Sequence, residues 1–109
     1  MDPNDSAAVA AFKSRVHHWP WEKIDYWTHS QKNQEFRYEK GVIIDDVISE
    51  VIDNIETAVC EHPNVNDRSD PTGILRVWIF HERCFGEMIY VKLEENGDRL
   101  VIMSAHRDD

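Results

Sequence analysis

Several histidine and arginine residues of this chain stand near the ends of predicted helices and strands. Together such side chains can cleave RNA without a metal ion. Metal-free cleavage needs a base for the 2′-hydroxyl proton, an acid for the leaving oxygen, and cations that hold the phosphate. Histidine serves as acid or base near neutral pH, and arginine donates two hydrogen bonds to a phosphate. We predict His29 and His106 as the acid–base pair and Arg37 and Arg76 as the phosphate-binding residues.

Other readings of these residues stay open. His81 and Arg107 are further candidates, since they too lie at element ends where side chains converge on one sheet face. Arg76 interrupts an apolar strand, and an ion pair with Glu87 or another acid on a neighbouring strand is the favoured interpretation. His106 lies close to the C-terminus, where a solvated position is common.

Cysteine and histidine residues also form two short pairs, Cys60-Glu61-His62 and His81-Glu82-Arg83-Cys84. Two cysteines and two histidines would satisfy a tetrahedral zinc ion. The spacing differs from paired Cys-x-x-Cys motifs, so a half-buried Cys60 beside an unrelated turn is the favoured interpretation. We predict no metal and no cofactor.

Aromatic residues are dense in the first quarter of the chain. The set comprises Trp19, Trp21, Tyr26 and Trp27. The favoured interpretation is a hydrophobic cluster that fastens the N-terminal helices to the sheet. A protein interface and base stacking are the alternatives.

Composition restricts the possible partners. The chain has 109 residues, which corresponds to one domain, and a net charge of −9. An acidic balance argues against broad binding of nucleic acid, which depends on phosphate neutralisation. No apolar run is long enough to span a membrane, and the N-terminus does not resemble a signal peptide. We therefore expect a cytoplasmic protein without membrane contact.

The hydrophobic pattern predicts helices followed by strands. An N-terminal helix and a Trp-Pro-Trp corner occupy 1–21, helices occupy 22–62, and an antiparallel meander occupies 73–106, with a polar loop over 64–73 between them. Asn96-Gly97 is a strong hairpin signal. The predicted fold is α+β, with two or three N-terminal helices on one face of a three- or four-stranded antiparallel sheet.

Three segments resemble the RelE/MqsR-like toxin superfamily and a small family of toxin-like proteins. These segments are Thr28-His29-Ser30, Gly41-VIIDDVISEVI-Asp53 and Arg99-LVIMSAHR-Asp108, and the likeness covers about residues 26–108. The resemblance implies an α+β fold, RNA cleavage, and a cognate antitoxin as partner.

Two functions follow as predictions. The first is a toxin-type ribonuclease that needs no metal. The second is an acidic, non-enzymatic protein that binds a basic, nucleic-acid-binding surface, such as an immunity protein, an antitoxin-like inhibitor or a phage-encoded anti-defence protein. Convergence of His29, Arg76 and His106 in one cleft favours the enzyme, and dispersal of these residues, with one broad acidic face, favours the binder.

Overall fold

The computed structural model describes residues 6–66 and 76–107, without the side chains of residue 6, residues 62–66 and Arg76. The elements in chain order are α1 Ser6–His17, η1 Trp21–Lys23, β1 Ile24–Tyr26, α2 Gln31–Lys40, α3 Ile44–Asp53, η2 Ile55–Thr57, β2 Val59–Asn66, β3 Arg76–Cys84, β4 Glu87–Asn96 and β5 Arg99–His106. This is an α+β fold, as the sequence predicts. Among the described residues, no helix is both long enough and apolar enough to cross a membrane.

Within the described residues, the sheet has five strands in the order β1-β5-β4-β3-β2, and not the three or four that the sequence predicts. It is also mixed, because β1 runs parallel to β5 while the other pairs are antiparallel. Arg99 of β5 donates to both carboxylate oxygens of Asp25 in β1, at 2.6 and 2.8 Å. Such a two-pronged contact fixes orientation, so it helps to hold the short parallel strand in place.

Strand β1 occupies a stretch that the sequence predicts as helix. Ile24 and Tyr26 are buried, and Asp25 between them is half-buried. Three residues are too few to distinguish this alternation from a helical period. The helix prediction is right from Gln31 onward, and Gly41 ends that helix in the left-handed conformation at φ 66°.

The third predicted helix is shorter than its apolar spacing indicates. α3 ends at Asp53, and the side-chain amide of Asn54 donates to the carbonyl of Glu50 at 3.0 Å. The following 3-10 turn buries Ile55, and Ala58 is buried after it. These two residues continue the helical spacing without continuing the helix, which explains the error.

Strand β2 begins at Val59, within the predicted helix, so the helix prediction up to residue 62 is wrong. Residues 64–66 of the predicted polar loop belong to this strand as well. The rest of that loop, 67–73, lies outside the described residues.

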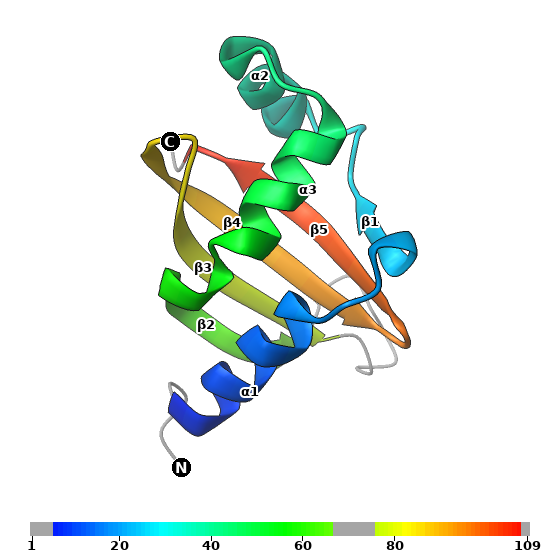
Figure 1. Ribbon diagram of the computed structural model, residues 1–109, viewed down its shortest axis with the longest axis vertical. Coiled ribbons are helices and arrows are strands. Elements are labelled where there is room, and N and C mark those ends of the chain that lie inside the picture. The colour runs from blue at the N-terminus through cyan, green and yellow to red at the C-terminus, as the bar shows by residue number, and fades with distance from the viewer. Residues whose placement is uncertain (1–5, 67–75, 108–109) are drawn as a thin grey trace.

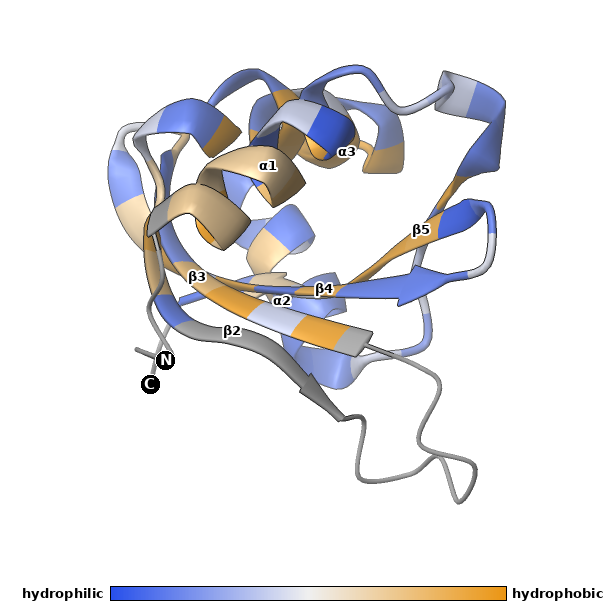
Figure 2. Ribbon diagram, turned by 90° about the horizontal axis from the view of Figure 1, so that it is seen from below, coloured by the Kyte–Doolittle hydropathy of each residue, from blue (hydrophilic) through white to orange (hydrophobic). Residues whose placement is uncertain are grey.

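The helices and the sheet form two layers. α1 and α3 cover one face of the sheet, which curves around them (Figure 2). α2 lies beyond the end of the sheet where β5 finishes (Figure 1). In the core, the ring of Phe12 from α1 stacks on Trp78 from β3, with centroids 4.1 Å apart. Large aromatic side chains of this kind dominate the energy of burial.

Tight turns join β3, β4 and β5. The hairpin predicted at Asn96-Gly97 is confirmed, and Gly97 has φ 62°. In the other turn both Phe85 and Gly86 have positive φ, at 53° and 81°. This conformation is unusual for a bulky side chain. The backbone amide of Phe85 donates to Glu50 Oε1 of α3 at 2.7 Å, which stabilises the turn.

Candidate active site

Three aromatic rings form a row across β3, β4 and β5. His81 is the cross-strand partner of Tyr90, and Tyr90 is the partner of His106. The ring centroids are 6.2 Å apart for His81 and Tyr90, and 5.6 Å apart for Tyr90 and His106. Two strand spacings of about 4.8 Å each separate the two histidines. A tyrosine therefore lies between two imidazoles.

The row lies on the sheet face opposite α1 and α3. Neighbouring residues of a strand point to opposite faces. Five of the six chain neighbours of these residues are buried: Phe80, Glu82, Ile89, Val91 and Ala105. The rings themselves are each only partly buried, so this face presents them to a ligand.

His106 has a defined tautomer. Its Nδ1 lies 2.7 Å from the carbonyl oxygen of Arg107. A carbonyl oxygen only accepts, so in the neutral ring Nδ1 carries the proton and Nε2 carries the lone pair. Nε2 is therefore the nitrogen that can remove a proton.

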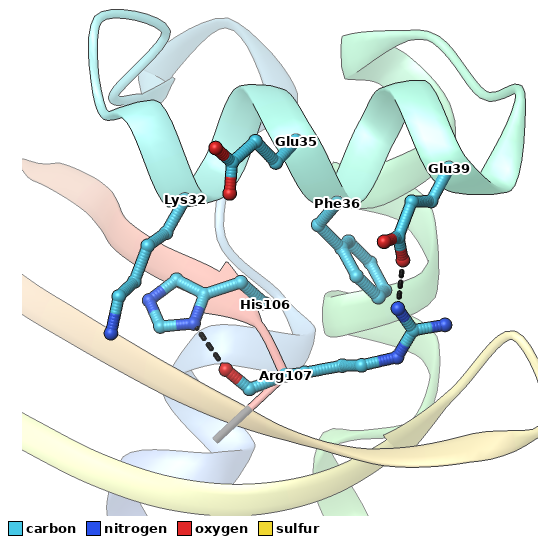
Figure 3. Close-up of a pocket in the computed structure, with 6 residues that line it drawn as sticks. All are labelled: Lys32, Glu35, Phe36, Glu39, His106 and Arg107. Carbon is cyan, nitrogen blue, oxygen red and sulfur yellow. Dashed lines mark hydrogen bonds and ion pairs between the residues drawn. The ribbon is translucent and has the colours of Figure 1, made fainter. Parts of the chain in front are cut away.

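An open pocket of about 160 Å³ adjoins His106 at the junction of α2 and β5. Figure 3 shows the imidazole beneath the N-terminal half of α2. The lining residues are Lys32, Glu35, Phe36, Glu39, His106 and Arg107. Positions 32, 35, 36 and 39 form one face of the helix, because residues three and four apart lie one above the other.

Arg107 is engaged by acidic side chains. It donates to Glu39 of α2, and to both carboxylate oxygens of Glu87 at 2.6 and 3.1 Å. Lys40 also pairs with Glu87. This network ties the end of β5 to α2 and to the start of β4. It holds the backbone next to His106, and it leaves the Arg107 guanidinium paired with carboxylates.

His81 is positioned by a carboxylate. Its Nε2 lies 3.1 Å from Glu61 Oε2 on the neighbouring strand β2. A carboxylate only accepts, so this ring nitrogen carries a proton. The contact orients the imidazole in the same way that a carboxylate orients many functional histidines.

Lys92 supplies a cation beside the row. It follows Tyr90 by two residues on β4, so it lies on the same face about 7 Å along the strand. Its cross-strand partner on β5 is Ser104. We call His81, Tyr90, Lys92, Ser104 and His106 the histidine face.

The predicted acid–base pair is only partly brought together. His29 lies in the turn before α2 and its ring contacts Trp27, with centroids 5.2 Å apart. It does not line the pocket beside His106. The histidine that shares a row with His106 is His81.

The two predicted phosphate-binding arginines lie away from this row. Arg37 packs over the ring of buried Tyr26 at 5.5 Å. Burial raises the pKa of Tyr26 to about 12, although Arg37 acts in the opposite direction. Arg76 is the cross-strand partner of Glu95, five residues from Tyr90 on β4, which is about 17 Å; its side chain lies outside the described residues.

The four candidate zinc ligands do not converge in the part of the chain that the structure describes. Cys84 and Cys60 pack with the core on the helix-covered face, whereas His81 lies on the other face. The side chain of His62 is outside the described residues. Within residues 6–66 and 76–107, no three His, Cys, Asp or Glu side chains are grouped to hold a metal.

Glu82 and Cys84 form a buried polar pair. Glu82 is 0% exposed, and the Cys84 thiol donates to its Oε1 at 3.0 Å. Burial raises the pKa of Glu82 to about 8 and raises the pKa of Cys84 strongly. A buried thiol of this kind is unreactive, so Cys84 is not a nucleophile.

Sequence reasoning missed Tyr90 and Lys92 as site residues. Their signal was the alternation of β4, in which Met88, Tyr90 and Lys92 oppose the apolar Ile89 and Val91. That pattern indicates that one face of the strand points away from the core. It gives no information on which residues of β3 and β5 lie beside them.

Comparison of the chain with models of known protein families, with characterised proteins and with solved structures finds no match.

Proposed function

We propose that this protein is a metal-independent ribonuclease that cleaves single-stranded RNA on the histidine face. The observation that carries the proposal is the row of His81, Tyr90 and His106, with ring centroids 6.2 and 5.6 Å apart. Two imidazoles on either side of a phenol match the base, acid and hydrogen-bond donor that phosphodiester cleavage requires.

His106 acts as the base. Its Nε2 accepts the 2′-hydroxyl proton while the 2′-oxygen attacks the phosphorus and forms a 2′,3′-cyclic phosphate. The bond from phosphorus to the 5′-oxygen breaks, and His81 in its doubly protonated form gives a proton to that oxygen. Atoms and charges balance without a metal or a second reactant.

Tyr90 and Lys92 hold the reacting phosphate in this scheme. The phenol stands between the two imidazoles, and the ammonium of Lys92 lies on the same face. Donors aimed at the phosphate stabilise the negative charge that develops in the transition state. A few local contacts of this kind are compatible with a net charge of −9, because they do not require a wide basic surface.

The RelE/MqsR-like resemblance gives further support. His29 and Arg37 have no direct part in this scheme. A toxin-type ribonuclease has a protein partner that blocks it, and we propose a cognate antitoxin in that role.

The test is cleavage of labelled single-stranded RNA in EDTA. Replacing the base, His106→Asn, should reduce the rate by about 10²- to 10⁴-fold, and His81→Asn should have a similar effect. His17→Asn is the matched control, because His17 is an exposed histidine on α1. Products of the wild type should end in a 2′,3′-cyclic phosphate. If all three variants cleave at the same rate and unfold at the wild-type midpoint, His106 and His81 are not the base and the acid.

A second candidate, the acidic binder, is favoured because His29 and the backbone of Arg76 lie away from the cleft beside His106. A different surface favours it as well. At the corner between α2 and α3, Tyr38 is 89% exposed and Ile43 is 64% exposed, and Glu39, Asp45 and Asp46 lie close to them in sequence. Exposed apolar side chains surrounded by acids suit a basic protein partner. Two results together would support this candidate over the ribonuclease. The folded wild type would cleave no RNA, and a Tyr38→Ala/Ile43→Ala variant would lose a basic partner that the wild type captures.

A further inference from the structure

The turn between β1 and α2 presents two aromatic rings that take no part in the proposed cleavage. Trp27 is 37% exposed, and its indole lies 5.2 Å from the exposed His29 ring at an angle of 39°. An exposed tryptophan beside a second ring offers a flat surface of the kind on which a nucleobase stacks.

This turn is held firmly against β5. The backbone amide of Trp27 donates to Ile102 O at 3.0 Å, and the buried Asn33 donates to Trp27 O at 3.0 Å. Gln34 donates to Thr28 O at 2.7 Å. The rings therefore stand on a fixed backbone, which lowers the cost of ordering them when a ligand binds.

Trp27 lies on the same face of the sheet as the two catalytic histidines. Ile24 and Tyr26 point into the core, so Asp25 belongs to the opposite face. β1 ends at Tyr26, but the Trp27 amide still bonds to Ile102 O, so the extended pairing continues for one residue and Trp27 falls on the face of Asp25. Tyr26 pairs with Ile102, which places Trp27 next to Met103, three residues before the end of β5. Three residues of strand span about 10 Å, so a short stretch of RNA can reach from Trp27 to His106.

A polar path connects the two places. Ser104 and Lys92 lie between Trp27 and the ring row as cross-strand partners. Lys32, three residues after His29 and in the first turn of α2, lines the pocket beside His106. These side chains suit the phosphates of a strand that runs from the turn toward the row.

We propose that Trp27 and His29 form a base-stacking subsite for a nucleotide adjacent to the cleaved phosphate of single-stranded RNA. The substrate class rests on the proposed ribonuclease function. Stacking accepts every base, because each has a π-face, so this subsite adds affinity and fixes register without strict sequence preference.

The experiment measures binding and cleavage of a labelled RNA hexamer by the full-length protein. Trp27→Ala should weaken binding by about 5- to 100-fold, the range that one stacked base contributes, and should raise KM with little change in kcat. Trp27→Phe should keep most of the affinity. Trp21→Ala is the matched control, since Trp21 is 49% exposed on η1, and it should bind as the wild type does.

Hexamers that each lack one base provide the second readout. At the position that contacts Trp27, removal of the base should weaken binding to the wild type and have little further effect on Trp27→Ala, because both changes remove the same contact. Additive losses at every position would overturn the subsite, as would equal affinity of Trp27→Ala and the wild type.

The outcomes separate the subsite from the ribonuclease. Cleavage that is insensitive to Trp27 would refute the subsite and leave the catalytic row in place. Trp27-dependent binding without cleavage would refute the catalytic row and retain the subsite. A wild-type protein that neither binds nor cleaves RNA would refute both proposals. If Trp27→Ala leaves RNA binding unchanged and weakens only the binding of a protein partner, the subsite is refuted and the turn is a protein interface.

Discussion

His106 and His81 differ in the groups that orient them, and this difference assigns their roles. A backbone carbonyl fixes the proton of His106 on Nδ1, while the carboxylate of Glu61 holds the Nε2 proton of His81. The first arrangement presents a lone pair at Nε2, and the second keeps a proton on the ring. In the proposed cleavage, His106 is therefore the base, and the proton left for the acid to donate is on Nδ1 of a doubly protonated His81, because Glu61 holds the Nε2 proton.

Glu82 gives a prediction about stability and pH. Burial raises the pKa of this carboxyl to about 8, from an ordinary value of 4.5. The folded protein therefore holds a proton that the unfolded chain releases, so the stability that depends on this proton is complete below pH 4.5 and is lost as pH rises toward 8. In Glu82→Gln the group cannot ionise and this loss should disappear.

Urea unfolding at pH 5.5 and pH 8 measures the effect. The free energy of unfolding of the wild type, relative to Glu82→Gln, should fall by about 3 kcal/mol between these pH values, at about 1.4 kcal/mol per pH unit. Glu56→Gln is the control, because Glu56 is exposed. An identical pH dependence for Glu82→Gln and the wild type would show that Glu82 is not the titrating group.

At the scale of elements, one buried amide positions α2 against β5. Asn33 is 0% exposed, donates to the carbonyls of Trp27 and Met103 at 3.0 and 3.1 Å, and accepts from the Ala105 amide at 2.9 Å. It thereby satisfies three backbone groups at the junction beside His106. Both the pocket and the Trp27 turn depend on this side chain.

Asn33→Ala should lower the free energy of unfolding by about 3 kcal/mol, because it leaves several backbone groups buried without partners. Tyr38→Ala, at a side chain that is 89% exposed on the same helix, should change it by less than about 0.5 kcal/mol. Chemical denaturation of the two variants compares them directly. Similar small effects for both would contradict the docking role of Asn33.

The elements that the sequence predicted correctly are long segments with a helical pattern and turns with a strong local signal. α1, α2 from Gln31 onward, and the Asn96-Gly97 hairpin belong to this group. β1 is too short to show a period. The false extension of α3 through Ile55 and Ala58 arose because a 3-10 turn buried residues at helical spacing. Tertiary contacts determine the secondary structure of such short segments, and a local sequence pattern does not show those contacts.

The candidate site was less predictable for a related reason. Histidines at element ends were identified, but cross-strand register determines which of them share a row. His106 pairs through Tyr90 with His81, whereas His29 lies one element away beside Trp27. The Asn96-Gly97 turn alone would pair Tyr90 with Ala105, and the bulge at Lys92/Leu93, which the sequence does not reveal, shifts the partner to His106.

At the scale of the whole molecule, the net charge of −9 limits how RNA can bind. Each phosphate contact with a single strand contributes about −0.7 to the slope of log K against log salt concentration. Two or three contacts on the histidine face predict a slope between about −1.4 and −2.1. Lys92→Ala should reduce its magnitude by about 0.7. A slope of about −4 or steeper would indicate a wide basic surface and contradict a local site.

The most direct test of the account is to locate RNA on the protein. NMR chemical shifts would be measured while a single-stranded RNA hexamer is added, with all its 2′-hydroxyls methylated so that it cannot be cleaved. If RNA binds on the histidine face, the largest changes occur at Tyr90, Lys92 and His106, with further changes at Trp27. Changes centred on Tyr38 and Ile43, or no changes at concentrations that saturate cleavage, would contradict it.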